Sequence, residues 1–478
     1  MLESELIKLI EDIQNKKTES NYIEVKSAHK GCPKIFDTLS SFSNQHNGGT
    51  IIFGIDENDD YNICGVYDAS DLQKKIMEQS LQMEPVVRPL CTVTMIKEKT
   101  VVSAEIQEMD NYQKPCFYKG AGRLRGSYVR VADGDRLMTE YEVYSYEAFK
   151  KDIHDELRVN ERAQLSDIET NEYKSYLLDL KINKPHLAKL EESEINRLQG
   201  FTVKNKPTIA SLMLFSVYPQ AYFPQLCITA VSVPGKEKSM TGSVGERFID
   251  NRRIEGSLTQ MLNDTLIFIR KNMKIKTIID SETGIRKDRT EYPVIAIREL
   301  VLNALIHRDY SIHTESAPIT VTMYSDRIEI ENPGGLYGRM TLDNLGLISA
   351  DTRNPYIAGA LEVMGETENR YSGIPTIRSA MKEANLPQPV FESNRGVFKA
   401  TLYNDIIDTK NKSLSITEQI LDYCSVPRSR HQLEERFKGD ITIAYLISKY
   451  MKPLITENKI ALTKPESPKS KDQKYYTV

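Results

Sequence analysis

Three polar residues of one segment, Glu299, Asn303 and His307, follow one another at intervals of four positions. On a helix this spacing places the three side chains on one face. The residues between them are mostly apolar, and because an unpaired buried polar group costs roughly 1–3 kcal/mol, the stripe needs partners. A carboxylate can activate water, and an asparagine oxygen can coordinate Mg²⁺ that is held on phosphates. A solvated helix edge or a satisfied buried network would explain the same stripe.

The elements that must position this stripe follow from the local pattern. Pro293 suits the first position of a helix that carries all three residues. Residues 319–331 alternate between apolar and polar, which predicts a β-hairpin. Short helices and loops are expected over residues 340–395, followed by a closing strand from Phe398 to Tyr403.

Residues 298–310, Arg-Glu-Leu-Val-Leu-Asn-Ala-Leu-Ile-His-Arg-Asp-Tyr, resemble the N-box of GHKL ATPases such as gyrase, MutL, histidine kinases and heat-shock chaperones. They are more similar still to the divergent GHKL domain of bacterial RecG-like or Schlafen-linked regulators. Residues 326–336 (Asp-Arg-Ile-Glu-Ile-Glu-Asn-Pro-Gly-Gly-Leu), 353–355 (Arg-Asn-Pro) and 372–374 (Ser-Gly-Ile) match the same subfamily. The resemblance covers roughly residues 290–403 and implies an α/β sandwich that binds ATP with Mg²⁺.

The resemblance also implies roles for single residues. Glu299 would be the base that activates water, and Asn303 would bind the Mg²⁺ that accompanies ATP. Gly334 and Gly335 would shape the nucleotide pocket, and Gly373 would lie where a lid approaches phosphate. The ATP-binding set that the resemblance implies is Glu299, Asn303, His307, Asn332, Gly334, Gly335, Arg353, Asn354 and Gly373.

One departure from the GHKL pattern concerns the nucleobase. Typical members have Asp-x-Gly-x-Gly, whose Asp accepts a hydrogen bond from the adenine amine, whereas this chain has Asn332-Pro-Gly-Gly335. An Asn carbonyl accepts that hydrogen bond more weakly, so we expect ATP binding without fast turnover. The sequence has no G-x-x-x-x-G-K-[ST], which excludes a P-loop as the alternative nucleotide site, and it has no helicase motor motif.

Three carboxylates near the N-terminus, Glu19, Glu24 and Asp56, flank two short predicted strands. Strand ends gather side chains at one edge of a sheet, so the three could converge and hold Mg²⁺ or Mn²⁺ for phosphodiester cleavage. Exposed acids at strand ends are also common. Glu24 could instead form a surface ion pair with Lys26, which lies on the same face of its strand.

The pattern around these carboxylates resembles the Schlafen AlbA-like domain over about residues 15–135. The matching residues are Glu19-Ser-x-x-x-Glu24-Val-Lys26, Phe42-Ser-Asn44, Asn47-Gly-Gly-Thr-Ile-Ile-Phe-Gly-Ile-Asp56 and Cys64-Gly-Val66. In animal Schlafens, two Glu and one Asp form a metal-dependent nuclease site for tRNA and rRNA, and Glu19, Glu24 and Asp56 fit that order. Many bacterial relatives carry the same framework and are taken to bind nucleic acid only.

Basic residues mixed with tyrosines lie between positions 114 and 136, a combination that suits phosphate contacts and base stacking. The candidates for nucleic-acid contact in this half of the chain are Lys26, Lys114, Arg123, Arg125 and Arg130. Residues 120–126, Gly-Ala-Gly-Arg-Leu-Arg-Gly, have the wrong spacing for a dinucleotide motif, and we interpret them as a flexible basic hairpin. A plain solvated loop would have the same composition.

Residues 412–478 carry 12 Lys and Arg against 8 Asp and Glu, although the whole chain is negative. Their pattern predicts three helices, a strand and a basic loop, which is the order of a winged helix with the third helix as reader. Lys449 and Lys452 on that helix favour phosphate contact. The tail also resembles that of the same regulator family, and the same architecture can serve protein contacts.

The whole chain of 478 residues has a formal net charge of −4, so nucleic-acid binding depends on local patches. Its six cysteines form no C-x-x-C pair, which argues against a zinc ribbon or a redox motif. No run of 18 apolar residues predicts a membrane span, and the N-terminal segment resembles an amphipathic helix rather than a signal peptide. We therefore expect a cytoplasmic protein that does not bind membranes.

The predicted fold class is α/β and multidomain. The expected parts are a Schlafen AlbA-like domain (1–150), a mixed α/β connector (151–285), a divergent GHKL sandwich (286–405) and a winged helix-turn-helix (412–478). The expected function is ATP-responsive binding of DNA or RNA, in a transcriptional regulator that forms a dimer or a higher homo-oligomer. The alternatives are a metal-dependent RNA or tRNA endonuclease that is gated by nucleotide and serves phage defence, and an assembly scaffold that binds no nucleotide.

Overall fold

The computed structural model describes residues 1–131, 134–242, 245–279, 286–349, 351–367, 373–404, 416–424, 427–437, 443–456, 459–464, 466 and 473–477. The chain forms two compact units, residues 1–404 and 405–478. Residues 405–415 lie outside the described part of the chain, as does Ser372 of the GHKL-like motif. None of the helices in the described part of the chain has the length and the apolar composition needed to cross a bilayer.

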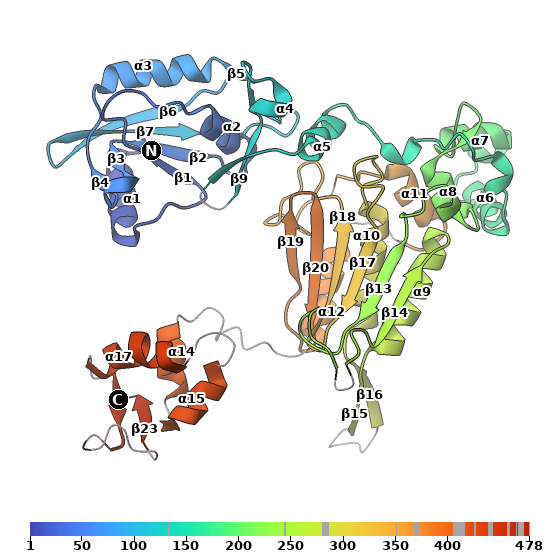
Figure 1. Cartoon of the computed structure of the whole chain (residues 1–478). Helices are drawn as coiled ribbons and strands as arrows, with labels where there is room; N and C mark the ends of the chain where they lie inside the picture. Colours follow the sequence, from blue (N-terminus) through green and yellow to red (C-terminus); the bar gives the residue numbers. More distant parts are fainter. Residues whose placement is uncertain are drawn as a thin grey trace. The chain divides into compact units, whose positions relative to one another are not determined.

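A four-stranded sheet forms the centre of the N-terminal part (Figure 1). Its strands, in spatial order, are β1 (Ile23–Lys26), β2 (Gly49–Phe53), β7 (Lys99–Ile106) and β6 (Leu90–Ile96). β1 runs parallel to β2, and the other pairs are antiparallel. Ile52 packs with α1 (Glu3–Lys16), whereas Ile51 and Phe53 pack with α2 (Phe36–Asn44) and α3 (Ala69–Ser80). Both faces of the sheet are therefore covered, which explains the continuous apolar run of β2.

Short elements surround this sheet. They are β3 (Ile55–Asp56), η1 (Glu57–Asp59), β4 (Asn62–Ile63), β5 (Met83–Glu84), β8 (Phe117–Tyr118), α4 (Arg123–Gly126), β9 (Tyr128–Val131) and β10 (Gly134–Leu137). The flexible hairpin expected at 120–126 is wrong, because its second half is the one-turn helix α4. An added Cβ at Gly126 would lie 2.6 Å from the carbonyl oxygen of Tyr118, so close packing rather than mobility accounts for this glycine. The helix α5 (Glu140–Lys150) follows β10 and begins with a capping box of Thr139 and Glu142.

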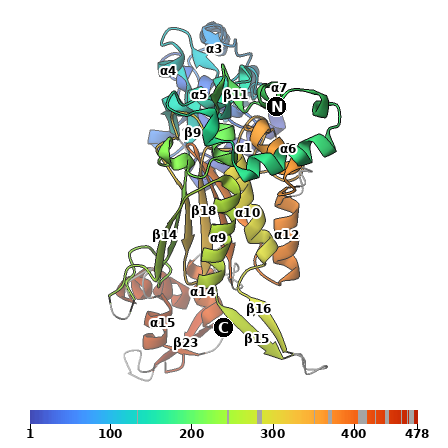
Figure 2. The ribbon, with the colours of Figure 1, turned by 90° about the vertical axis from the view of Figure 1, so that its right-hand side faces the viewer.

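A six-stranded sheet forms the second body of the same unit. Its strands, in spatial order, are β14 (Asp250–Ile254), β13 (Ile228–Ser232), β17 (Ile319–Met323), β18 (Arg327–Pro333), β20 (Val397–Tyr403) and β19 (Val390–Asn394). Only the β13–β17 pair is parallel. Figure 2 shows α9 (Leu258–Asn272), α10 (Val294–His307) and α12 (Gly373–Glu383) side by side along one face of the sheet. The edge strand β19 was not expected, because its alternately exposed residues have no apolar stripe that would predict it.

All but the last two of the remaining described elements of this unit lie in the expected connector, and those two lie in the range expected for the GHKL domain. They are η2 (Asp155–Leu157), η3 (Leu165–Asp167), α6 (Asn171–Asn183), η4 (Leu187–Lys189), α7 (Glu192–Leu198), β11 (Thr202–Val203), β12 (Lys206–Pro207), α8 (Ile209–Phe215), η5 (Pro219–Ala221), β15 (Ile275–Ile279), β16 (Arg286–Thr290) and α11 (Pro355–Val363).

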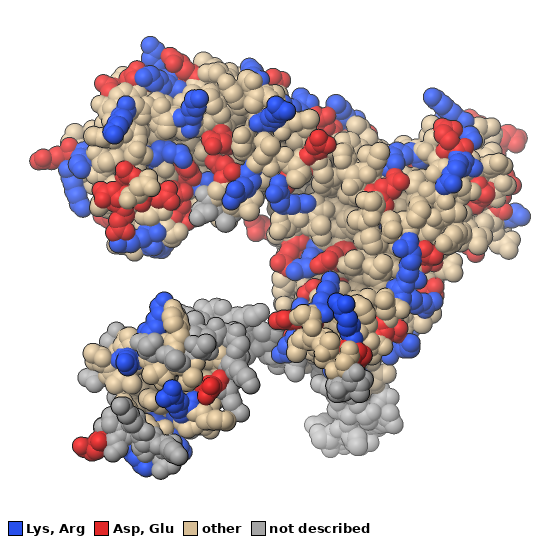
Figure 3. All heavy atoms as spheres, viewed as in Figure 1, with Lys and Arg blue, Asp and Glu red and all other residues tan. Residues whose placement is uncertain are grey.

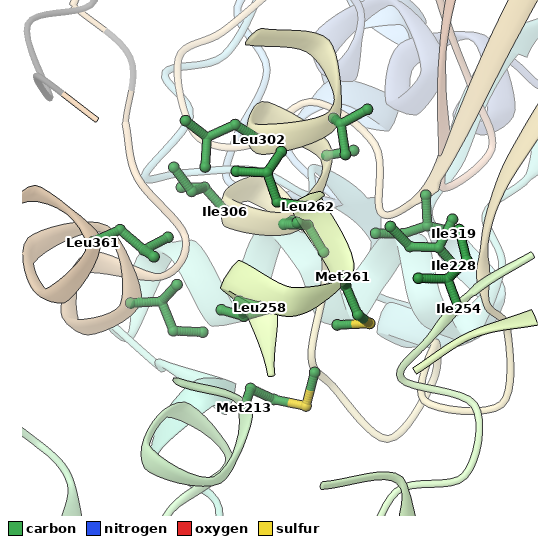
Figure 4. Packing of buried hydrophobic residues seen from close by; sticks show 14 of the residues in the cluster. Met213, Ile228, Ile254, Leu258, Met261, Leu262, Leu302, Ile306, Ile319 and Leu361 are labelled. Carbon is green, nitrogen blue, oxygen red and sulfur yellow. The ribbon is translucent and has the colours of Figure 1, made fainter. Parts of the chain in front are cut away.

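One hydrophobic core joins the expected connector to the expected GHKL domain. The buried cluster runs from Ala163 to Leu402 without a break between the two. Figure 4 shows Leu262 of α9 beside Leu302 of α10, and Met213 of α8 on the side of Leu258 and Met261 of α9. Since β13, β14 and α9 all precede the expected boundary at 285/286, that boundary cuts through a single sheet and a single core.

The C-terminal unit has its own small core around Leu433 and Leu446. Its elements are α14 (Ile416–Tyr423), β21 (Arg428–Ser429), α15 (Arg430–Phe437), α16 (Ile443–Tyr445), η6 (Leu446–Met451, a π-helical turn), α17 (Lys452–Thr456), β22 (Ile460–Leu462) and β23 (Lys474–Thr477). The strands form one sheet in the order β21-β23-β22. Helices therefore precede a terminal pair of strands, with β21 and β23 as additions to the expected order.

Candidate functional site

A cavity of about 550 Å³ lies between α10, β18 and the start of α12. Eight of the nine residues expected in the ATP site line it. They are Glu299, Asn303, His307, Asn332, Gly334, Gly335, Arg353 and Gly373. These residues come from four separate segments, so the fold brings together what the sequence separates.

Helix α10 supplies one wall of this cavity. Its other faces are buried by apolar residues such as Ile297 and Val301, which leaves the polar stripe to face the hollow. The first residue of α12, Gly373, packs against this stripe. An added Cβ at Gly373 would lie 2.8 Å from Asn303 Nδ2 and 3.1 Å from Glu299 Oε2. The start of α12 therefore lies beside Glu299 and Asn303.

The strand β18 supplies the floor. Its residues alternate, so Ile330 and Asn332 face the helices and the cavity, where Ala400 joins them from β20. Asn332 is only 4% exposed, and its Oδ1 has no hydrogen-bond partner among the described residues. An unsatisfied buried acceptor is costly, and a ligand donor is one way to satisfy it.

Arg353 lines the cavity and forms a buried ion pair with Asp309. Its Nη1 lies 2.8 Å from Asp309 Oδ2, and both side chains are almost fully buried. Burial alone would raise the pKa of Asp309, but Arg353 and a hydrogen bond from Tyr141 outweigh it, so the pKa lies below its usual value. Arg353 also donates to the Gly335 carbonyl (3.3 Å) and lies 4.9 Å from the ring centre of Tyr337. The ion pair thus fixes the position of residues 334–337, which line the cavity and which we call the glycine segment.

His307 is neutral at physiological pH. Burial lowers its pKa to about 4, and the positive charge of Arg353 acts in the same direction. The imidazole therefore contributes hydrogen-bonding capacity to the cavity and no positive charge.

Asn354 is the one residue of the expected ATP site that does not line the cavity. It is fully buried, and its Nδ2 donates to the carbonyl oxygens of Ile306 and Arg308, both at 2.7 Å. These carbonyls lie at the end of α10, where a helix has no internal donors left. Asn354 therefore fixes the end of the helix that carries the stripe, and spacing in the sequence could not reveal this contact.

The N-terminal carboxylates are arranged differently from the expected metal site. Arg130, whose side chain is 1% exposed, donates to Glu24 (2.8 Å) and Asp135 (3.2 Å) and lies 3.4 Å from Glu19. Asp56 is not part of this group, since its carboxylate caps η1 by accepting from Asn58 N at 3.0 Å. We call the group of Arg130, Glu19, Glu24 and Asp135 the Arg130 cluster.

The donor set of the Arg130 cluster does not fit a divalent metal. Among the described residues no three His, Cys, Asp or Glu side chains are grouped so that they could hold a metal ion. Burial raises the pKa of Glu19 to about 7, and the neighbouring Glu24 adds to this rise. A guanidinium already supplies the positive charge between the carboxylates, and Lys26 supplies a second one through its ion pair with Glu24. The expected metal triad is therefore not formed.

Most of the expected nucleic-acid contacts in this part are already engaged. Lys114 is 5% exposed and pairs with Glu108 at 2.6 Å, and Arg123 pairs with Glu147. Arg130 is buried in its cluster, so Lys114 and Arg130 are wrong as surface contacts. Arg125 is exposed on α4. On the face shown in Figure 3, acidic and basic side chains are interspersed over the N-terminal part. In the C-terminal unit, Lys449 and Lys452 are exposed, and Lys449 donates to the hydroxyl of Tyr445 at 2.6 Å.

Sequence reasoning gave no role to Asp309, Tyr141 or Asp135. Asp309 stands next to the stripe in the motif His-Arg-Asp-Tyr, so its position was a usable signal. Tyr141 and Asp135 meet their partners 168 and 5 positions away, and nothing in their local pattern marks them.

Two family models match the chain. Residues 19–139 match "Schlafen, AlbA_2", and residues 316–402 match HATPase_c_4, described as "Putative ATP-dependent DNA helicase recG C-terminal". No curated protein matches the chain.

Two solved structures show similarity to the chain. The DIP2311 protein from Corynebacterium diphtheriae is 18% identical, with a TM-score of 0.40 over 90% of this chain and 89% of that chain. The N-terminal domain of a "Putative ATP-dependent DNA Helicase RecG-related Protein" from Nitrosomonas europaea is 24% identical, with a TM-score of 0.23 over 28% of this chain and 94% of that chain. With TM-scores this low, neither similarity supports the assignment of a function or of a role for any residue.

The family matches agree with the resemblances seen in the sequence, and they fall on the two bodies of the larger unit. The chain is thus a multidomain α/β protein that combines a Schlafen AlbA_2 domain with a RecG-type HATPase domain, and through these domains it is related to proteins of nucleic-acid biology.

Proposed function

We propose that the cavity beside α10 binds ATP with Mg²⁺. The observation that carries this proposal is the gathering of Glu299, Asn303, Asn332 and Gly373 around one hollow of about 550 Å³. The unsatisfied Oδ1 of Asn332 suits the amine of adenine. Asn303 would hold Mg²⁺ and Glu299 would orient or activate water, the two roles for which their side-chain chemistry is suited.

The charges of the cavity support a metal-bound nucleotide. Both arginines in its described lining already bind carboxylates, Arg298 with Glu366 at 2.7 Å and Arg353 with Asp309 at 2.8 Å. A polyphosphate therefore depends on Mg²⁺ and on the N–H groups at the start of α12 for charge compensation. We expect ATP to bind weakly when Mg²⁺ is absent.

We further propose that this nucleotide site belongs to a nucleic-acid-binding regulator. The AlbA_2 domain and the C-terminal unit, as a winged helix, would contact DNA or RNA, with Arg125, Lys449 and Lys452 among the contacts. ATP would shift the protein between states that differ in nucleic-acid affinity. A dimer or higher oligomer, a role in transcription and a cytoplasmic location complete this proposal.

We do not propose the nuclease alternative, because no feature of the Arg130 cluster favours it. The guanidinium of Arg130 lies among the carboxylates that a catalytic metal would need. A role in phage defence would then rest on binding rather than on cleavage.

Calorimetric titration of the full chain with ATP tests the nucleotide proposal. We expect binding that strengthens with Mg²⁺, and we expect Asn303→Ala to weaken ATP·Mg²⁺ by about tenfold or more, which is about 1.4 kcal/mol. Asn272→Ala on the neighbouring α9, where Asn272 bonds to Asp250 and the Phe268 carbonyl, is the matched control. Absence of binding in the wild type would leave the scaffold alternative. Equal affinities in Asn303→Ala and the wild type would remove Asn303 from the site.

A further inference from the structure

The helix α5 lies against the outer side of the cavity wall. It directly follows β10 of the AlbA_2 domain, so the chain connects it to that domain without a long linker. Residues 334–337 line the cavity on their inner side. Near one end of α5, Tyr141 contacts Asp309, which pairs with the Arg353 that holds the glycine segment. Near the other end, Phe149 contacts Tyr337 of the glycine segment. α5 is thus placed between the cavity and the AlbA_2 domain.

The first contact runs through a shared carboxylate oxygen. The hydroxyl of Tyr141 donates to Asp309 Oδ2 at 2.7 Å, and the same oxygen lies 2.8 Å from Arg353 Nη1. Burial raises the pKa of Tyr141 to about 12, so its hydroxyl keeps its proton and remains a donor. The Tyr141 ring also lies on the turn at Gly396, where an added Cβ would be 2.4 Å from Cε1.

The Asp309–Arg353 pair has little room to move without moving the cavity wall. An added Cβ at Gly334 would lie 2.4 Å from Arg353 Nη1 and 2.7 Å from the Asp309 Cβ. Arg353 donates to the Gly335 carbonyl on the next residue. In such close packing, a displacement of Arg353 is transmitted to its neighbours rather than absorbed.

The second contact is at the other end of α5. The Phe149 ring lies 5.4 Å from the ring of Tyr337, edge to face, and 4.8 Å from the ring of Tyr112 in the AlbA_2 domain. Asn111 Nδ2 donates to the Gly338 carbonyl at 2.9 Å. Phe149 therefore touches the glycine segment on one side and the AlbA_2 domain on the other.

We propose that α5 relays occupancy of the nucleotide cavity to the AlbA_2 domain, with Tyr141 as the positioning residue that holds the Asp309–Arg353 pair. This relay rests on the proposed function, since it needs a nucleotide in the cavity. A nucleotide that displaces residues 334–337 also displaces Arg353, which donates to the Gly335 carbonyl, and so disturbs its ion pair with Asp309. The carboxylate, and with it Tyr141, is then released from its present geometry, and α5 loosens.

Hydrogen–deuterium exchange of the α5 amides in the full chain tests the relay, with and without ATP·Mg²⁺. We expect the nucleotide to speed exchange in the wild type by about threefold to tenfold, the range that corresponds to one hydrogen bond. In Tyr141→Phe, α5 should exchange faster before nucleotide is added, and the nucleotide should cause no further change.

Tyr144→Phe is the matched control, because Tyr144 on the same helix donates to Asp155 at the same distance of 2.7 Å and Asp155 does not line the cavity. This variant should keep the nucleotide response. Calorimetric titration of the same samples separates the two proposals. Nucleotide binding with unchanged α5 exchange in the wild type overturns the relay alone, and this comparison needs no variant. A preserved response in Tyr141→Phe overturns the role of Tyr141. Absence of binding overturns the proposed function and the relay together.

Discussion

Arg130 is the residue on which the local account of the AlbA_2 domain depends. Its guanidinium forms ion pairs with three carboxylates that would otherwise repel one another, and it also donates a hydrogen bond to the Ile23 carbonyl of β1. A buried ion pair that loses one partner leaves an uncompensated charge, which is far more costly than the loss of an exposed pair. The cluster therefore acts as a structural centre that ties β9 and β10 to β1.

We predict that Arg130→Met destabilises the chain by about 3–5 kcal/mol, because Glu19, Glu24 and Asp135 lose their shared cation. Equilibrium denaturation with urea, followed for the AlbA_2 domain, measures this loss. The control is Arg125→Met on the surface of α4, where a change within about 0.5 kcal/mol is expected. Equal and small effects at both positions would show that Arg130 is not a structural centre.

His307 makes the stability of the second body depend on pH. Its pKa is about 4 in the folded chain against 6.5 as the ordinary value, so between these limits the unfolded chain binds a proton that the folded chain does not. The contribution is fully present above pH 6.5 and is lost as the pH falls towards 4. The free energy of unfolding should therefore fall by about 1–3 kcal/mol more in the wild type than in His307→Gln over this window. Unfolding curves at several pH values check this, with exposed His186→Gln as control, and parallel pH profiles of wild type and His307→Gln would refute it.

At the scale of elements, α10 owes its position to its two ends. Pro293 stands at the N-cap position, and Asn354 satisfies the carbonyls at the C-terminal end. The start of α11 is fixed in turn by Glu156, which accepts from the backbone N–H groups of Tyr356 and Ile357. The cavity therefore depends on residues that never touch it.

We predict that Asn354→Ala costs about 1–3 kcal/mol of stability, because two buried carbonyls lose their donor. It should also weaken nucleotide binding modestly by loosening the end of α10. Thermal unfolding and calorimetric titration measure the two effects. Asn183→Ala on the exposed surface of α6 serves as the control. A variant with wild-type stability and tenfold weaker binding would instead make Asn354 a direct ligand.

The elements that sequence patterns predicted well are those with a strong apolar period. α10 and the β17–β18 hairpin were found because their buried faces repeat at the helical and strand spacings. The edge strands β14 and β19 were missed because exposed edges carry no such period. The Arg130 cluster could not be predicted either, since Arg130 lies 106 positions from Glu24 and 111 from Glu19. Local spacing instead suggested Asp56, which only caps its own turn.

At the scale of the whole molecule, the larger unit places a nucleotide-type cavity and an AlbA_2 domain on either side of α5. The shared core of connector and HATPase sheet makes the second body one rigid support for the cavity. The smaller unit adds a separate helical module with exposed lysines. Our proposal that nucleotide binding changes the affinity for nucleic acid depends on this organisation.

The most direct test is the affinity of the full chain for labelled tRNA, single-stranded RNA and duplex DNA, measured by fluorescence anisotropy with and without ATP·Mg²⁺. The account predicts intact nucleic acid and an affinity that changes at least about fivefold with ATP, corresponding to about 1 kcal/mol of coupling. Asn303→Ala should abolish this change while leaving the nucleotide-free affinity intact, and Glu24→Ala should cause no change in cleavage. Cleavage that disappears in Glu24→Ala, or an affinity that ATP does not alter in the wild type, would contradict the account.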